Sequence, residues 1–248
     1  QESAHRSMPF LLIDKPAGIT SHDVVDRVRK ITGERTVGHA GTLDPFATGM
    51  LILGVGREST KHLNTFLGMG KTYEAIIRLG ESSTTLDPEG EIVAVGGADL
   101  TLEAIETAMK SLTGDILQIP PMHSAIKIGG QKLYDLARKG IEIDRPPRPV
   151  KISRFVIQDA QFAQGGNPPV AQTQRSLILP LNLPVVIDCS SGTYIRAIAR
   201  DLGENLGTAG YLTQLRRSAI GPYGIDSTTP LSDITPENWA SLAKKLVP

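Results

Sequence analysis

The sequence contains a single cysteine, Cys189, which excludes an intrachain disulfide. One cysteine in 248 residues fits a protein of the reducing cytoplasm, and we expect this localisation. Cysteine, histidine and aspartate do not cluster at the spacings that metal ligands need, so no metal site is expected. The chain also lacks an apolar run long enough to span a membrane, and its first residues lack the pattern of a signal peptide.

The chain carries no net charge, so its overall charge gives no signal for a nucleic-acid partner. The charges are nevertheless unevenly distributed. Residues 81–115 contain eight acidic residues and one basic residue, whereas residues 127–154 contain eight basic and three acidic residues. Such segregation can build a basic face on a neutral protein. Two solvated surfaces of opposite sign explain the same pattern, and on charge alone this simpler interpretation is favoured.

Length and composition are ordinary for a soluble globular protein. A chain of 248 residues suits one large domain or two small ones, and 40% hydrophobic with 21% charged residues supports a sizeable core. Residues 1–7 are polar and show no periodicity, and we interpret them as a remnant of cloning before a natural start at Met8.

Hydrophobic patterns predict strands and helices in mixed order. Apolar runs predict strands over residues 10–14, 51–55, 72–79, 150–157, 176–179 and 185–189. Helical spacing of apolar residues, with capping signals, predicts helices that begin near Ser21, Thr101, Leu133, Ile195 and Thr235. A segment rich in glycine and proline, 164–174, predicts a loop. Because strands and helices do not strictly alternate, we expect an α+β fold with a largely antiparallel sheet.

One carboxylate, Asp44, lies within a run of small residues that extends from Gly38 to Leu51. Asp44 precedes a proline, which disfavours the helical conformation at this position. Glycines on both sides permit close backbone approaches. The pattern is typical of a loop that presents one acid to a large ligand. An aspartate that hydrogen-bonds its own turn gives a similar pattern, and for an isolated Asp-Pro pair that reading is preferred.

The run from Gly38 to Leu51 closely resembles motif II of the TruB family of tRNA pseudouridine synthases, in which the aspartate is the catalytic nucleophile. Other blocks resemble further family motifs and follow in the family order between Phe10 and Tyr223. They are Leu11–Ser21 (motif I), Lys71–Tyr73, Pro120–Lys127, Lys132–Tyr134, Ala137–Gly140, Cys189–Arg196 (motif III) and Leu215–Arg217.

The resemblance implies the pseudouridine synthase fold, a mixed and largely antiparallel sheet flanked by helices with a central catalytic cleft. It also implies isomerisation of a uridine in the T loop of tRNA, at position 55. The base is detached, turned and rejoined through carbon, without a cofactor and without a metal. We therefore expect the T stem-loop of tRNA as partner, no membrane association, and a monomer.

The resemblance assigns three catalytic residues. Asp44 would be the nucleophile and would attack either C1′ of the sugar or C6 of the base. Arg196 would pair with Asp44 and keep it ionised. Tyr73 would stack on the extruded base, and its hydroxyl could transfer a proton. Taken in isolation, the pattern around Arg196 also fits a surface arginine of a helix, and that around Tyr73 fits a core tyrosine.

Substrate contacts are implied for four further residues besides Tyr73. Tyr194 and Leu215 would line the uracil pocket, although both are ordinary core residues when considered alone. His39 would lie against the T loop in the space left by displaced bases, and Asp87 matches a family acid near the substrate. Basic residues of the 127–154 region, together with Arg216 and Arg217, could bind phosphates, which would position the RNA without reading its sequence.

Several positions depart from the family pattern. Thr84 stands where an aspartate is common, and His123 stands where a tyrosine is frequent. The segment 158–184 is longer than usual. We expect a catalytic domain over residues 8–231 and a C-terminal helix over 232–248. The C-terminal RNA-binding domain that many relatives carry would then be either truncated or naturally missing.

Two other functions compete with the synthase. A non-catalytic RNA-binding or RNA-folding protein could use the same scaffold, but simple binding does not require Asp44, Tyr73 and Arg196 together. A glycoside or nucleoside hydrolase could use Asp44, but such enzymes usually need a second catalytic carboxylate, and no nearby acid has a matching pattern.

Overall fold

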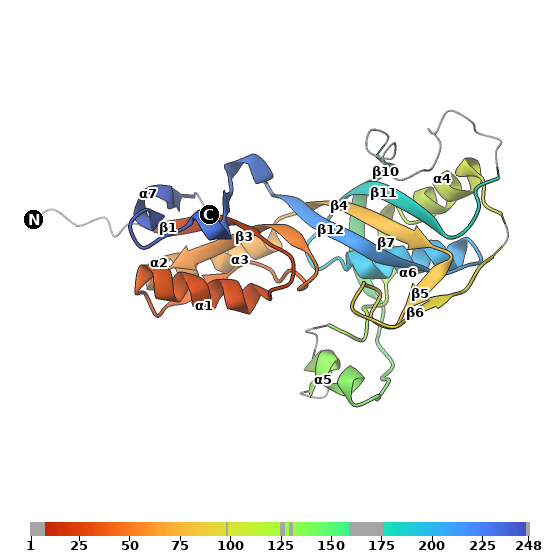
Figure 1. The fold of residues 1–248 in the computed structure, drawn as a ribbon, viewed down its shortest axis with the longest axis horizontal. Coiled ribbons are helices and arrows are strands. Elements are labelled where there is room, and N and C mark those ends of the chain that lie inside the picture. The colour runs from red at the N-terminus through yellow and green to blue at the C-terminus, as the bar shows by residue number, and fades with distance from the viewer. Residues whose placement is uncertain (1–7, 98, 125–126, 129–130, 159–175, 247–248) are drawn as a thin grey trace, which may run out of the picture. The chain divides into compact units, whose positions relative to one another are not determined.

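The computed structural model describes residues 8–97, 99–124, 127–128, 131–158 and 176–246 (Figure 1). The chain forms two compact units. Unit 1 comprises Gln1–Tyr73 and Leu215–Pro248, and unit 2 comprises Glu74–Gln214. The predicted catalytic domain of residues 8–231 includes parts of both units and stays a prediction.

Unit 1 is built on a mixed sheet whose strands follow the order β14-β1-β3-β12. β1 (Pro9–Lys15) runs antiparallel to β3 (Thr48–Val55), and β14 (Thr229–Pro230) runs parallel to β1. β12 (Gly210–Ile220) runs parallel to β3. Three short strands pair with members of this sheet: β2 (Val37–His39) pairs with β3, β13 (Tyr223–Gly224) with β12 and β15 (Lys244–Lys245) with β1.

The core of unit 1 lies on both faces of this sheet. Leu11 and Ile13 of β1 join one buried cluster, whereas Phe10 and Leu12 join the other, because successive strand residues point to opposite faces. A strand covered on both faces reads as a continuous apolar run, which is why the sequence predicted it. The helices are α1 (Ser21–Thr32), α2 (Arg57–Thr60), α3 (Leu63–Gly68) and α7 (Trp239–Leu242), with 3₁₀ turns at Ile225–Ser227 and Leu231–Asp233.

Helix α1 packs its valines at positions 24, 25 and 28 into the first cluster. It begins one residue earlier than its predicted cap implies. Thr20, not Ser21, is the N-cap, and it forms a capping box with Asp23. Gly33 ends the helix in the left-handed conformation, with φ of 70°. The hydroxyl of Ser21 is thereby free to contact another segment.

In unit 2, the sheet order is β12-β4-β11-β10-β7. β4 (Lys71–Leu79) enters this unit at Glu74, and β12 leaves it at Leu215. β11 (Leu181–Cys189), β10 (Arg148–Ile157) and β7 (Gly114–Gln118) are successively antiparallel. The other elements are β5 (Glu81–Ser83), β6 (Ile92–Ala94), β8 (Lys127–Ile128), β9 (Gln131–Lys132), α4 (Leu102–Ser111), α5 (Leu133–Arg138) and α6 (Ile195–Asn205).

Helix α6 packs closely against the start of β12 because two glycines leave room. A Cβ atom on Gly203 would lie 2.3 Å from the backbone of residues 209–210, and one on Gly210 would lie 2.4 Å from the carbonyl oxygen of Ala199. The apolar face of α6, with Ile198 and Leu202 fully buried, covers the sheet of unit 2.

The predicted strands at 10–14, 51–55, 72–79, 150–157 and 185–189 are confirmed. The strand predicted over 176–179 is wrong, because this segment forms only a single bridge between Leu177 and Leu100. The final helix is shorter than expected: Asn238 caps the backbone N–H of Thr235, α7 has four residues, and the chain then pairs with β1 as β15. The predicted loop 164–174 lies outside the described residues.

Candidate active site

The Asp44 loop of unit 1 is held by motif I residues that contact both neighbours of Asp44. The hydroxyl of Ser21 accepts a hydrogen bond from the N–H of Leu43 (2.9 Å) and donates one to its carbonyl oxygen (3.2 Å). The carbonyl oxygen of Pro45 accepts hydrogen bonds from the N–H of Gly18 (2.8 Å) and from Nζ of Lys15 (3.2 Å). The backbone on each side of the carboxylate is therefore fixed by residues 15–21.

Lys15 is fully buried, and its ammonium group also donates to the carbonyl oxygens of Pro16 (2.8 Å) and Ile19 (2.7 Å). These bonds close the turn that carries Gly18. The lysine therefore connects its own turn to the Asp44 loop. The loop also closes on itself through the N–H of Ala47, which donates to the carbonyl oxygen of Asp44 (3.0 Å).

Arg217 supports the two ends of the same loop from β12. Its guanidinium donates to the carbonyl oxygens of Gly41 (3.0 Å) and Met50 (2.9 Å), and the residue is 1% exposed. Gly49 has a φ of 107°, and a Cβ there would lie 2.3 Å from the backbone of Arg217, so β3 and β12 need a glycine at this crossing. The expectation that Arg217 binds phosphate is wrong, because the side chain is buried and bonded to the loop.

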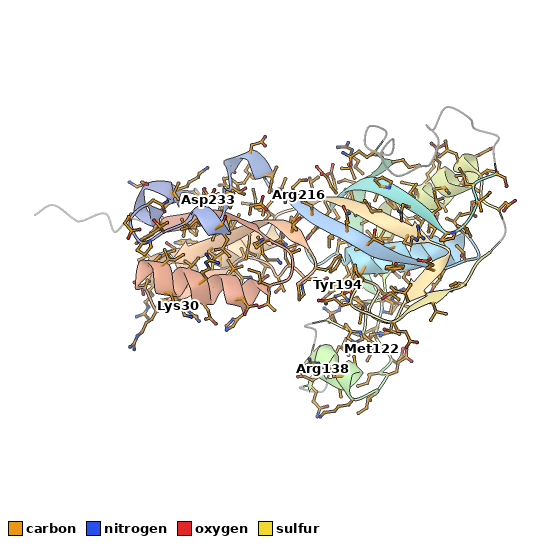
Figure 2. All side chains as sticks on the ribbon, in the orientation of Figure 1. Lys30, Met122, Arg138, Tyr194, Arg216 and Asp233 are labelled. Carbon is orange, nitrogen blue, oxygen red and sulfur yellow. The ribbon has the colours of Figure 1, made fainter. Side chains whose placement is uncertain are left out.

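Arg216, labelled in Figure 2, precedes the buried Arg217 in β12 and forms a two-point ion pair with Asp14. The two N···O distances are 3.0 and 2.8 Å, and Nη1 also donates to the hydroxyl of Thr48 (3.3 Å). The guanidinium of Arg216 thus already has an anionic partner in Asp14. Its contact with an RNA phosphate stays a prediction.

Three other predicted residues of unit 1 lie in or near its core. Tyr73 is 8% exposed on β4 and Leu215 is 7% exposed on β12. Burial is required both for lining a base pocket and for ordinary core packing, so their roles stay predictions. His39 ends β2, and its Nδ1 atom is buried without a hydrogen-bond partner among the described residues. Burial lowers the pKa of His39 below its usual value, which favours the neutral ring.

Arg196 is the buried charged centre of unit 2. It lies in the first turn of α6, is 5% exposed, and donates to the carbonyl oxygens of Thr85 (3.0 Å) and His123 (2.7 Å). Its Nη1 atom is 4.0 Å from a carboxylate oxygen of Asp87. The simpler interpretation of Arg196 as a surface arginine is therefore wrong.

Asp87 lies in a constrained turn after β5. Its carboxylate accepts hydrogen bonds from the hydroxyl of Thr85 (2.5 Å) and the N–H of Glu89 (2.9 Å). Leu86 has a φ of 63°, which is rare for a residue with a branched side chain. This turn presents the Thr85 carbonyl and the Asp87 carboxylate to the same guanidinium. The nearby His123 ring has a lowered pKa, mainly from burial and then from the charge of Arg196.

Tyr194 is the N-cap residue of α6 and is labelled in Figure 2. Its backbone is bonded by Gln118, a residue that the sequence analysis did not single out. Gln118 ends β7 and is 1% exposed. The sequence signals the role of Gln118 only weakly, through a polar residue that follows the apolar pair Ile116 and Leu117.

The predicted site residues thus form two sets. His39, Asp44, Tyr73 and Leu215 belong to unit 1, and Asp87, Tyr194 and Arg196 belong to unit 2. Unit 2 brings Asp87 and Arg196 together directly. The pairing of Asp44 with Arg196 joins the two sets and stays a prediction. Within the described ranges, no group of three or more histidine, cysteine, aspartate or glutamate residues could hold a metal ion.

The structure contains no helix, within the part of the chain that it describes, that is long and apolar enough to cross a membrane. A shallow hollow in unit 2 is lined by residues of β7 and β10 and by Ser190. It includes none of the predicted catalytic or uracil-pocket residues, although Lys151, one of the basic residues of the 127–154 region, is part of its lining.

Comparison with known proteins relates this geometry to a family. The model of the N-terminal domain of the TruB family of pseudouridylate synthases matches residues 29–195. A tRNA pseudouridine synthase B of Arthrobacter sp. (strain FB24) is 45% identical over 96% of this chain and 76% of its own length. One of Mycobacterium tuberculosis (strain ATCC 25618 / H37Rv) is 45% identical over 94% of this chain and 74% of its own length.

The fold is also similar to that of solved structures. A chain in the crystal structure of a Cbf5-Nop10-Gar1 complex aligns with 97% of this chain and 61% of its own length, with a TM-score of 0.70 and 23% identity. The expected α+β fold, a mixed sheet flanked by helices, is confirmed. Because the family model covers more than half of the sequence and the relatives match most of it, the chain belongs to the TruB family of pseudouridylate synthases and is an isomerase.

Proposed function

We propose that the protein converts a uridine of tRNA to pseudouridine with Asp44 as its nucleophile. The relatives described above are named tRNA pseudouridine synthases B, and the chain matches 74–76% of their length. The observation that carries the role of Asp44 is the support of its loop, because both neighbours of the carboxylate are held by residues 15–21. A carboxylate acts as a covalent catalyst only when it is correctly placed.

The reaction is an isomerisation, so no atoms are gained or lost overall. The bond between N1 of uracil and C1′ of the ribose breaks, and a bond between C5 and C1′ forms. C5 loses a proton and N1 gains one. Asp44 would attack either C1′ or C6, and Tyr73 would move the proton. Family membership argues against a hydrolase, which would release the base, and against a protein that only binds RNA.

The guanidinium of Arg196 would pair with Asp44 during this reaction. Two backbone carbonyls and Asp87 hold the guanidinium within unit 2. A planar guanidinium that is fixed at several points is held in one orientation. Removing Asp87 should therefore disturb the reaction through Arg196, without requiring that Asp87 contact the RNA.

We further propose that the target is the uridine at position 55 in the T loop. A base inside a folded loop must be flipped out, which costs a few kcal/mol, about the amount that stacking and polar contacts in a pocket can restore. Tyr73, Tyr194 and Leu215 would form that pocket, and His39 would contact the loop. Burial keeps His39 neutral near pH 7, so it would contact the RNA by packing and hydrogen bonding.

Incubation with an unmodified tRNA transcript, followed by mapping of pseudouridine, tests both levels of the proposal. We expect one pseudouridine, at position 55, and none in a transcript that carries cytidine there. Product elsewhere in the tRNA would contradict the target but not the activity.

Asp44→Asn keeps the size of the side chain and removes the nucleophile, so it should bind tRNA and make no product. Equal yield from wild type and Asp44→Asn would contradict the role of Asp44, and release of free uracil would indicate a hydrolase.

A further inference from the structure

The side chain of Gln118 binds the backbone of Tyr194 at two points. Its amide oxygen accepts the N–H of Tyr194 at 2.8 Å, and its amide nitrogen donates to the Tyr194 carbonyl oxygen at 3.1 Å. The two residues are 76 positions apart in the sequence. A primary amide is the side-chain group that offers an acceptor and a donor side by side, as a neighbouring strand would do.

These bonds fall where α6 has no other side-chain cap. Tyr194 is the N-cap residue, and its own side chain makes no capping hydrogen bond. Its carbonyl oxygen accepts from the N–H groups of Ala197 (3.1 Å) and Ile198 (3.3 Å), whereas its N–H lies outside the helical ladder and needs a partner from elsewhere. Gln118 supplies that partner and orients the first turn of the helix.

The segment that begins with Gln118 contacts α6 at two more places. The carbonyl oxygen of Ile119 accepts Nη2 of Arg200 at 2.8 Å, and that of His123 accepts Nη2 of Arg196 at 2.7 Å. Residues 118–123 therefore bind the first two turns of α6 through one side chain and two carbonyls. Only the first of these contacts depends on the identity of the residue in this segment, since any residue supplies a carbonyl.

We propose that Gln118 is a positioning residue for the isomerisation: it fixes the backbone of Tyr194 and thereby the guanidinium of Arg196, two residues later. This inference rests on the proposed function. Arg196 must meet two carbonyls and Asp87 at once, so a small rotation of the first turn of α6 would move all three distances. Displacements of about 1 Å in a catalytic group can cost on the order of 100-fold in rate.

The test begins with Gln118→Met, which has a similar volume and no hydrogen-bonding amide. We expect single-turnover formation of pseudouridine in a tRNA transcript to slow by about 10- to 100-fold, with little change in tRNA affinity. Gln158→Met makes the same chemical change at a partly exposed position of unit 2 and should keep the wild-type rate. If the role of Gln118 is purely structural, Gln118→Met should have a lower melting temperature and a wild-type rate per folded molecule. That result would overturn the proposal.

Gln118→Glu provides a readout that stability alone would not move. The ionised carboxylate accepts the N–H of Tyr194 but repels its carbonyl oxygen, whereas the protonated acid can both accept and donate, as the amide does. We expect the rate relative to wild type to rise as the pH is lowered, with folding followed at each pH by circular dichroism. If the ratio of the Gln118→Glu rate to the wild-type rate does not change with pH, the proposal is contradicted. This test holds even if Gln118→Met does not fold.

Combination with Arg196→Lys shows whether Gln118 acts through the arginine. If it does, Gln118→Met should slow the Arg196→Lys enzyme much less than it slows wild type, because the group that it positions is already lost. Fully multiplicative losses would contradict this route. A wild-type protein that makes no pseudouridine would defeat the proposed function itself, whereas an active wild type with an equally active Gln118→Met would defeat only this inference.

Discussion

The two sets of predicted site residues are held by different chemistry. In unit 1, the buried cations Lys15 and Arg217 donate to backbone carbonyls in and around the Asp44 loop. In unit 2, the buried cation Arg196 donates to backbone carbonyls as well, but it also faces the carboxylate of Asp87. Arg217 is hydrogen-bonded to two backbone carbonyl oxygens, whereas the guanidinium of Arg196 also lies 4.0 Å from a carboxylate oxygen of Asp87.

The difference shows what each cation does. Carbonyl oxygens that accept from Lys15 and Arg217 fix the path of the chain around Asp44. In unit 2, the carboxylate of Asp87 offsets the charge of a guanidinium that is taken out of water, which is costly without a partner. The buried cations Lys15 and Arg217 of unit 1 therefore organise a backbone, whereas the buried pair of Arg196 and Asp87 in unit 2 balances a charge.

Replacing each buried arginine by methionine should separate these two cases, and the larger loss is expected in unit 2. Arg196→Met leaves Asp87 buried without its cation, which should lower the free energy of unfolding by about 3 kcal/mol. This is near the lower end for buried pairs, because Asp87 keeps its hydrogen bonds from Thr85 and Glu89. Adding Asp87→Asn should restore part of the loss, as measured by urea denaturation. No recovery in the double variant would contradict the charge-balancing role.

Arg217→Met should cost less, about 1–3 kcal/mol, because it leaves carbonyl oxygens rather than a carboxylate without a partner. Turnover should fall as well, since the ends of the Asp44 loop lose a common anchor. Arg27→Met, at an exposed position of α1, is the matched control and should change the unfolding free energy by no more than about 0.5 kcal/mol. A loss at Arg217 as large as that at Arg196 would remove the distinction between the units.

The comparison also shows which parts of the fold could be predicted. β1 and β3 are covered on both faces, so their sequences are continuous apolar runs that identify them as strands. β12 was not predicted, although at 11 residues it is the longest strand in the part of the chain that the structure describes. Its sequence combines apolar residues with Thr213, Gln214, Arg216 and Arg217, and the last of these is buried. A strand that buries an arginine does not follow the alternation of apolar and polar residues on which such predictions depend.

The site shows the same limit. Asp44, Tyr73 and Arg196 were identified because whole motifs around them resemble a family, and not because their local patterns are distinctive. The supporting roles of Lys15, Ser21 and Arg217 could not be predicted. Their partners are backbone carbonyl and N–H groups, which every residue carries, so the partner leaves no trace in the sequence. The fold alone brings such groups within reach of the side chain.

Ser21→Ala is a milder test of the support in unit 1. The substitution removes both hydrogen bonds to Leu43, each of which contributes about 1 kcal/mol, and it leaves the Thr20 cap of α1 intact. We expect a modest drop in melting temperature and a several-fold slower single-turnover rate. The control, Thr20→Ala, should cost about 1 kcal/mol of stability through the lost cap, while leaving the rate nearly unchanged. Equal rates in the two variants would show that Ser21 does not support the loop specifically.

The smallest expected effect is the pH dependence that one histidine gives to each unit. Burial lowers the pKa of His39 in unit 1 and of His123 in unit 2, and the neighbouring Arg217 and Arg196 act in the same direction. In the unfolded chain each ring titrates near pH 6.5. The folded protein binds these protons less readily, so the full stability is present above about pH 6.5 and declines as the pH falls from there towards the lowered pKa values.

The variants His39→Asn and His123→Asn should each weaken this acid-induced loss, and the double variant should weaken it further. Melting temperatures measured from above pH 7 down to about pH 5 would show it. Asp87 opposes the shift at His123, since its carboxylate favours the charged ring, whereas no carboxylate contributes to the shift at His39. Asp87→Asn should therefore lower the pKa of His123 further, steepen the acid-induced loss that depends on this ring, and leave the His39 contribution unchanged. A steeper response in Asp87→Asn that persists after His123→Asn would show that the carboxylate acts on another group.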